Sequence, residues 1–170
     1  LLPFINAAGE IKTKPTQHSV KELLNAGIQP DIIMCRCERK INIESIDKIA
    51  LFCNVKKSNV IPALNAKSIY EVPSLYYKAG LDKSLLTEFN YKEKNHKLNL
   101  KPWNNVVKKL NNLKTKIKIG IVGKYTDLQD SYKSLSEALV HGGFANNVKV
   151  DICWINSEKL SAQKIIHQIK

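Results

Sequence analysis

The chain has 170 residues and a formal net charge of +12, from 27 Lys and Arg against 15 Asp and Glu. With 44% hydrophobic and 25% charged residues, its composition is ordinary for a globular protein that buries a core. No apolar run approaches the ~18 residues of a membrane span, and four cysteines are too few for a disulfide scaffold.

The basic residues are almost all lysine and are spread along the chain, with arginine only at Arg36 and Arg39. Nucleic-acid readers usually depend on arginine, so this pattern favours solvated surface lysines, although a polyanion-binding surface stays open. No secretory signal is visible, and we expect a reducing cytoplasm as the location. The chain starts without Met inside an apolar run and stops inside a helical pattern, so we expect an internal piece of a longer polypeptide.

Strand and helix patterns alternate along residues 1–90, which predicts an α/β fold with a parallel sheet. The predicted elements are a strand over 1–6, a helix over 19–27, a strand over 32–35, a helix over 44–54, a strand over 60–64, and helices over 69–80 and 81–89. Ser19 and Glu22 are three residues apart, a capping-box spacing that places the start of the first helix after the loop 12–17.

Residues 91–116 are rich in Lys and Asn and predict a linker that holds one amphipathic helix. A second α/β pattern follows over 117–170 and predicts the start of a flavodoxin-like parallel sheet. Its elements are a strand over 117–123, a helix over 130–141 that ends at Gly142-Gly143, a strand over 148–155, and a helix from 157 onward.

One loop combines two ammonium groups with hydroxyl and amide donors: Lys12, Thr13, Lys14, Pro15, Thr16 and Gln17. Because Pro15 favours an extended conformation at the preceding residue, Lys12 and Lys14 are expected to face the same side. The loop also leads into a predicted helix N-terminus, which favours anions. Two interpretations stay open, a phosphate-binding loop and a solvated basic loop.

Arg36 lies at the carboxyl end of the predicted strand 32–35, where open α/β sheets bind ligands. It could reach a phosphate or carboxylate, or pair with Glu38. The flanking Cys35 and Cys37 are expected on opposite faces of the strand, which argues against a shared metal ion. Lys48 by itself is typical of a solvated helix lysine.

Four segments resemble the CTP synthase family in order and spacing: GEIKTKPTQHSVKELLNAGIQPDIIMCR, KIALFCNV, SIYEVP and IGIVGKYTDLQDSYKSLSEAL. The resemblance implies the C-terminal part of a P-loop-type amidoligase (synthetase) domain over 1–90, an interdomain linker over 91–116, and the beginning of a class-I glutamine amidotransferase domain over 117–170. Such enzymes convert UTP to CTP with ATP, Mg²⁺ and ammonia from glutamine, are tetramers, and take GTP as an effector.

The resemblance also assigns site residues. Those implied to contact the triphosphate of UTP or of the inhibitor CTP are Lys12, Thr13, Lys14, Pro15, Thr16, Gln17 and Lys48. Those implied near ATP are Arg36, Leu64, Asn65 and Ala66. No residue of the chain matches a catalytic residue or a magnesium ligand of the family, so the chain alone is expected to be inactive.

Two alternatives come from other classes of protein. A nucleic-acid-binding module would use the lysines between 92 and 116. A non-catalytic relative would keep the same fold without turnover. The resemblance favours the enzyme, with no nucleic acid and no membrane among the expected partners.

Overall fold

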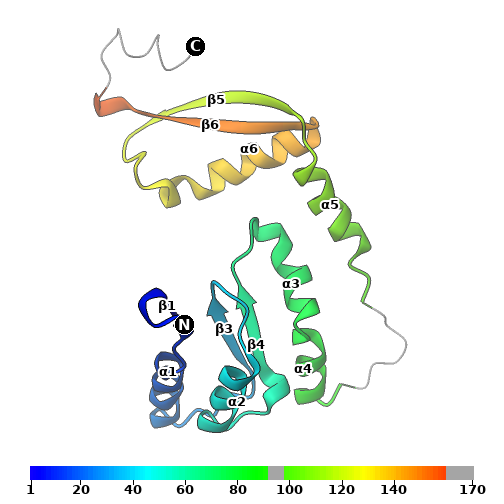
Figure 1. The fold of residues 1–170 in the computed structure, drawn as a ribbon. Helices are drawn as coiled ribbons and strands as arrows, with labels where there is room; N and C mark the ends of the chain where they lie inside the picture. The colour runs from blue at the N-terminus through cyan, green and yellow to red at the C-terminus, as the bar shows by residue number, and fades with distance from the viewer. Residues whose placement is uncertain (92–97, 160–170) are drawn as a thin grey trace. The chain divides into compact units, whose positions relative to one another are not determined.

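The structure, a computed structural model, describes residues 1–91 and 98–159 (Figure 1). The chain forms two compact units, residues 1–104 and 105–170. Both units combine helices with small two-stranded sheets, so the predicted α/β class is confirmed. The boundary between the units falls within helix α5, Lys101–Asn111.

Unit 1 contains a short antiparallel hairpin and a parallel strand pair. Its elements are β1 Phe4–Ile5, β2 Glu10–Ile11, α1 Lys14–Asn25, β3 Ile33–Cys37, α2 Ile43–Phe52, β4 Val60–Leu64, α3 Val72–Lys78 and α4 Leu81–Glu88. Strands β3 and β4 are parallel and in register from Ile33 opposite Val60 to Cys37 opposite Leu64. The crossover through α2 agrees with the parallel sheet that the sequence predicts.

The predicted strand over 1–6 is largely wrong, because only Phe4–Ile5 is strand and it pairs antiparallel with Glu10–Ile11. The hairpin reverses through Gly9, whose positive φ of 65° is a conformation that glycine adopts without strain. Before β1 the chain runs beside β3, where the Leu2 N–H donates to the Arg36 carbonyl at 2.8 Å. The first residues therefore complete the core without joining the parallel sheet.

Helix α1 begins at Lys14 and not after the loop 12–17 as predicted. Pro15 lies in its first turn, where a missing N–H costs nothing because that group has no partner inside a helix. The Ser19 hydroxyl donates to the Pro15 carbonyl at 3.0 Å, so it does not cap a helix start. Pro15 therefore indicates the start of α1 more closely than the capping-box spacing of Ser19 and Glu22.

Strand β3 alternates strictly, with Ile33, Cys35 and Cys37 buried and Met34 and Arg36 exposed. The prediction that the two cysteines face opposite sides is therefore wrong, because residues two apart in a strand share a face. Burial, with a smaller contribution from Cys37, raises the pKa of the Cys35 thiol to about 11. These thiols pack in the core with Leu2, Val20, Ile41, Ile49, Cys53 and Val60.

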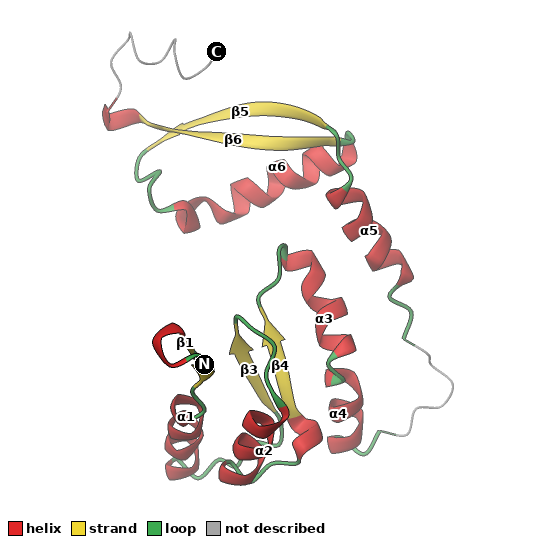
Figure 2. Ribbon diagram, in the orientation of Figure 1, coloured by secondary structure: helices red, strands yellow, loops and turns green. Residues whose placement is uncertain are grey.

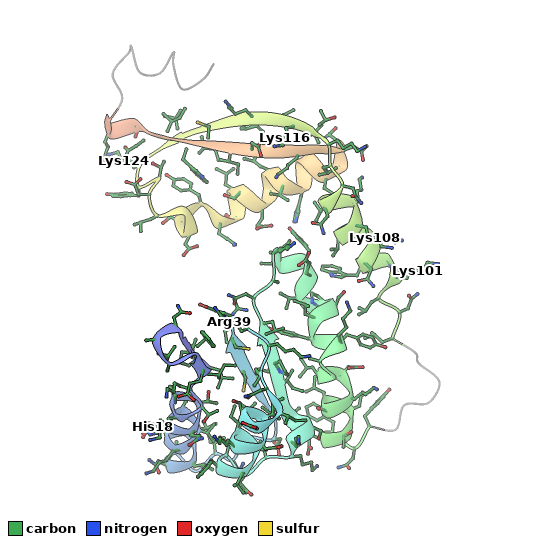
Figure 3. All side chains as sticks on the ribbon, in the orientation of Figure 1. His18, Arg39, Lys101, Lys108, Lys116 and Lys124 are labelled. Carbon is green, nitrogen blue, oxygen red and sulfur yellow. The ribbon has the colours of Figure 1, made fainter. Side chains whose placement is uncertain are left out.

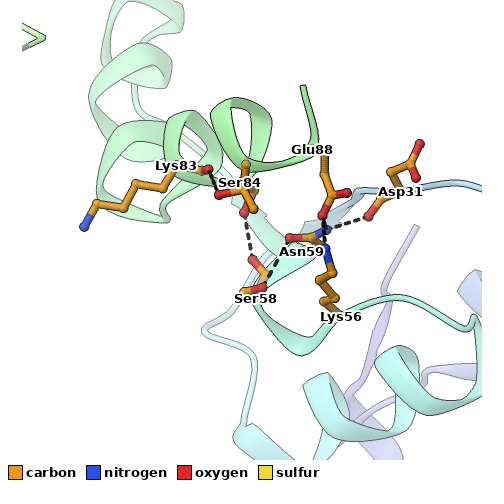
Figure 4. Close-up of polar contacts among 8 residues, drawn as sticks. Asp31, Lys56, Ser58, Asn59, Lys83, Ser84 and Glu88 are labelled. Carbon is orange, nitrogen blue, oxygen red and sulfur yellow. Dashed lines mark hydrogen bonds and ion pairs between the residues drawn. The ribbon is translucent and has the colours of Figure 1, made fainter. Parts of the chain in front are cut away.

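A polar cluster connects α4 to the start of β4 (Figure 4). The buried Asn59 amide donates to the Asp31 carbonyl at 2.9 Å and to the Glu88 carboxylate at 2.7 Å. Lys56 donates to the same carboxylate at 2.7 Å. Lys56 and Asn59 together lower the pKa of Glu88. These contacts hold the helix against the amino-terminal end of the sheet.

Unit 2 is built on a parallel pair, β5 Thr115–Gly123 and β6 Val148–Asn156, with α6 Lys133–Ala145 along one face (Figure 2). The predicted end of α6 at Gly142-Gly143 is wrong, because the helix continues to Ala145. A Cβ on Gly143 would lie 2.6 Å from the Val148 carbonyl oxygen. This glycine allows helix and strand to approach closely.

Three further predictions concern the linker helix, the first strand of unit 2 and the last helix. Helix α5 confirms the predicted amphipathic helix, and its Trp103 indole donates to the Tyr70 carbonyl at 2.7 Å. Strand β5 confirms the strand over 117–123 and starts two residues earlier. Residues 157–159 form a 3₁₀ turn, and the rest of the predicted helix lies outside the described residues.

Candidate phosphate-binding site

A pocket of about 250 Å³ lies between the β1–β2 hairpin and the beginning of α2. The hairpin side contributes Glu10, and Thr13 follows it. The opposite side contributes Arg39 and Lys40 from the β3–α2 connection and Lys48 from α2. These three cations outnumber the two acidic residues of the lining, Glu10 and Glu44, so the pocket carries a net positive charge and suits an anionic ligand.

Helix α2 places Lys48 at this pocket because its N-terminus is anchored there. The Asn42 side chain accepts from the Ser45 N–H at 3.0 Å and caps the helix, which begins at Ile43, one residue before the predicted bound of 44. Ser45 and Lys48 are three residues apart and so lie on one helix face, and both line the pocket. The unpaired N–H groups of the first turn add positive potential on the same side.

The structure brings Lys12 and Lys48 to the same carboxylate, although they are far apart in sequence. Lys12 forms an ion pair with Glu10, and that contact is the largest cause of the lowered pKa of the Glu10 carboxyl. Lys48 lowers the same pKa from the α2 side. Tertiary structure therefore joins two residues that sequence patterns treat as separate.

The other residues of the predicted loop take different positions. Thr13 lines the pocket and its hydroxyl accepts from the Gln17 amide at 3.1 Å. Thr16 is buried, and its hydroxyl donates to the Leu1 carbonyl at 2.8 Å. Lys14 and Pro15 are exposed in the first turn of α1.

The extended geometry predicted for residues 12–17 is wrong, because the helix already begins at Lys14. Lys12 and Lys14 therefore do not share a side through strand alternation. The predicted grouping is kept in part: Lys12 and Thr13 lie directly before the start of α1, and Thr13 lines the same pocket as Lys48 of α2.

A second pocket of about 250 Å³ lies at the carboxyl end of β3 and includes Arg36, Glu38 and Asn65. The Arg36 guanidinium donates to the Leu64 carbonyl at 3.1 Å across the β3–β4 pair. Among the described residues Arg36 forms no ion pair with Glu38, so the pairing that the sequence left open is not formed. The structure thus groups Arg36, Leu64 and Asn65, and Ala66 follows directly in the chain.

Sequence reasoning missed four charged residues of the first pocket, Glu10, Arg39, Lys40 and Glu44. The Arg39 guanidinium lies over the Phe4 ring at 3.9 Å from its centroid, and both residues line the pocket (Arg39 is labelled in Figure 3). For Glu10 the available signal was its alternation with Lys12, which places both on one side of an extended segment. For Arg39 the signal was its position just after a buried strand.

Within the described ranges, no three His, Cys, Asp or Glu side chains are arranged to hold a metal ion. In the same part of the chain, no helix is long and apolar enough to cross a membrane.

Comparison with known proteins finds one family model and several curated relatives that match the chain. A family model described as the CTP synthase N-terminus matches residues 1–91. The CTP synthase of Zymomonas mobilis is 54% identical over 158 residues, which is 93% of this chain and 29% of that protein. The CTP synthase of Rhodospirillum rubrum is 50% identical over 170 residues, 100% of this chain and 31% of that protein. The chain thus spans about 30% of the length of these curated relatives.

Proposed function

The chain belongs to the CTP synthase family, and from that premise we propose that it is part of an enzyme that aminates UTP to CTP. ATP phosphorylates the uracil O4, and ammonia released from glutamine displaces the phosphate. The whole enzyme is a homotetramer that requires Mg²⁺ and takes GTP as an effector. Its role is the synthesis of pyrimidine nucleotides in the cytoplasm.

The observation that carries the proposal is the convergence of Lys12, Thr13 and Lys48 around Glu10 at the start of α2. In this proposal the two ammonium groups neutralise the triphosphate of UTP or CTP and hold its position. They transfer no proton. Lys14, Pro15, Thr16 and Gln17 complete the site, with Thr16 acting through the backbone that its buried hydroxyl fixes.

ATP binds at the second pocket in this proposal. Arg36, together with the backbone of Leu64, Asn65 and Ala66, contacts it beside β3 and β4. In unit 2, two parallel strands of nine residues each are connected through α6, and this arrangement supports a class-I glutamine amidotransferase domain that begins near residue 117. Residues 1–90 then form the end of the synthetase domain, and 91–116 form the linker.

A lysine substitution in the longer enzyme tests the assignment. Lys48→Met removes one charge-assisted contact and is expected to weaken UTP binding by about 1.5–3 kcal/mol, measured by isothermal titration calorimetry. Lys108→Met is the matched control, because Lys108 is an exposed lysine of α5. Glutamine hydrolysis without UTP should stay the same in both variants.

Two results would contradict the proposal. Unchanged UTP affinity in Lys48→Met would remove the phosphate site from this pocket. An equal loss in Lys108→Met would show general attraction by a basic chain and not a site.

A further inference from the structure

We propose that Glu10 is an internal counterion of the phosphate site, whose carboxylate competes with the phosphates of the ligand for Lys12. This inference rests on the proposed function, because it concerns the same pocket. It assigns a residue that opposes binding within a pocket whose cations outnumber its carboxylates, and it therefore predicts that substitution of Glu10 raises the affinity for the ligand.

The hairpin fixes the two partners of the ion pair. Glu10 lies in β2 opposite Ile5 of β1, and the Lys12 N–H donates to the carbonyl of Pro3, the residue before β1, at 2.9 Å, so the backbone at both residues is held. Ile11 between them is half-buried toward the core. The Glu10 and Lys12 side chains are thereby directed to the same side, where the Lys12 ammonium donates to the Glu10 carboxylate.

The surrounding charges make this carboxylate unusual. Lys12 faces it from its own segment and Lys48 from α2, while Arg39 and Lys40 line the same pocket from the β3–α2 connection. Glu44 in the first turn of α2 is the other acidic residue of the lining. A triphosphate that enters this pocket meets three cations of the lining and two carboxylates, of which Glu10 is already paired with Lys12.

The pair is weak enough to exchange. The side chains of Lys12 and Glu10 are 46% and 57% exposed, and ion pairs at this exposure contribute little to stability. An ammonium group that leaves Glu10 for a phosphate keeps a charge-assisted hydrogen bond. The carboxylate then lies unpaired close to the anionic ligand and repels it, which lowers the affinity.

Glu10→Gln in the longer enzyme tests this directly, because the amide keeps the shape of the side chain and removes its charge. UTP and inorganic triphosphate are expected to bind about 2–10-fold more tightly at low salt, and uridine to bind unchanged. The gain should shrink as salt is raised, since partly exposed charges are screened. Calorimetry with each probe measures the effect.

Two further variants give the control and the mechanism. Glu22→Gln makes the same change of net charge on the exposed surface of α1, away from the pocket, and should leave all three affinities unchanged. In a double-mutant cycle with Lys12→Met, the gain from Glu10→Gln should fall, because the competition is for Lys12.

Weaker or equal UTP binding in Glu10→Gln would overturn the inference and make Glu10 a residue that positions Lys12 for the ligand. An equal gain in Glu22→Gln would overturn it in favour of net charge. Either result leaves the proposed function standing as long as Lys48→Met weakens UTP binding. If Lys48→Met has no effect, the proposed function fails independently.

Discussion

Replacing Gly143 with Ala is expected to destabilise the packing of α6 on β6, although alanine is the better helix former. The new Cβ would lie 2.6 Å from the Val148 carbonyl oxygen and 2.8 Å from a methyl group of Val150. The first of these atoms belongs to the backbone and cannot rotate away, so helix and strand must separate. Overpacking of this kind costs about 1–3 kcal/mol.

The helix propensity of alanine offsets part of this cost. Alanine gains up to about 1 kcal/mol over glycine inside a helix, which leaves a net loss of up to about 2 kcal/mol. Gly142 provides the matched control, because a Cβ there has no atom within 4 Å. Gly142→Ala should therefore stabilise the same helix by about 0.5–1 kcal/mol. The two neighbouring substitutions are predicted to have opposite signs.

Hydrogen exchange of the backbone amides of α6 and β6 is the suitable assay, because it reports local opening in a protein of more than one unit. Gly143→Ala should exchange faster than the parent protein and Gly142→Ala more slowly. Equal protection in the two variants would refute the close approach of α6 to β6. It would also restore the interpretation of these glycines as a helix stop.

Three further predictions test other contacts. The pKa of Glu88 is lowered, so its contribution to the free energy of unfolding is complete above the ordinary pKa of 4.5 and is lost as the pH falls through the pKa of the folded protein. Glu88→Gln should therefore flatten the acid side of a plot of stability against pH, measured by denaturation. Tyr132→Phe removes a 2.6 Å hydrogen bond to the Lys124 carbonyl, directly after β5, and should cost about 1 kcal/mol in the same hydrogen-exchange assay. Tyr125→Phe, at an exposed ring, is the control and should change the exchange rates by nothing measurable. Maleimide at pH 7.5 should label the half-buried Cys153 before Cys35, which is fully buried with a pKa of about 11, as followed by peptide mass spectrometry; equal rates would contradict the burial.

The sequence alone determined the elements whose signals are local. The strand Val60–Leu64 was predicted at its observed bounds, because a short apolar run between polar residues has few alternatives. The start of α2 was predictable from Asn42, whose side chain caps the helix through a contact three residues away. The resemblance likewise came from residues that are contiguous in the chain.

Tertiary structure decided what depends on contacts between distant segments. The bounds of β1 and β2 follow from their pairing with each other, and Gly143 lies inside α6, where the absence of a side chain lets β6 pack closely. The pocket is the clearest case, since Lys48 resembles any solvated helix lysine until the hairpin places Glu10 and Thr13 beside it. Periodicity describes one element at a time, whereas a binding site depends on how several elements meet.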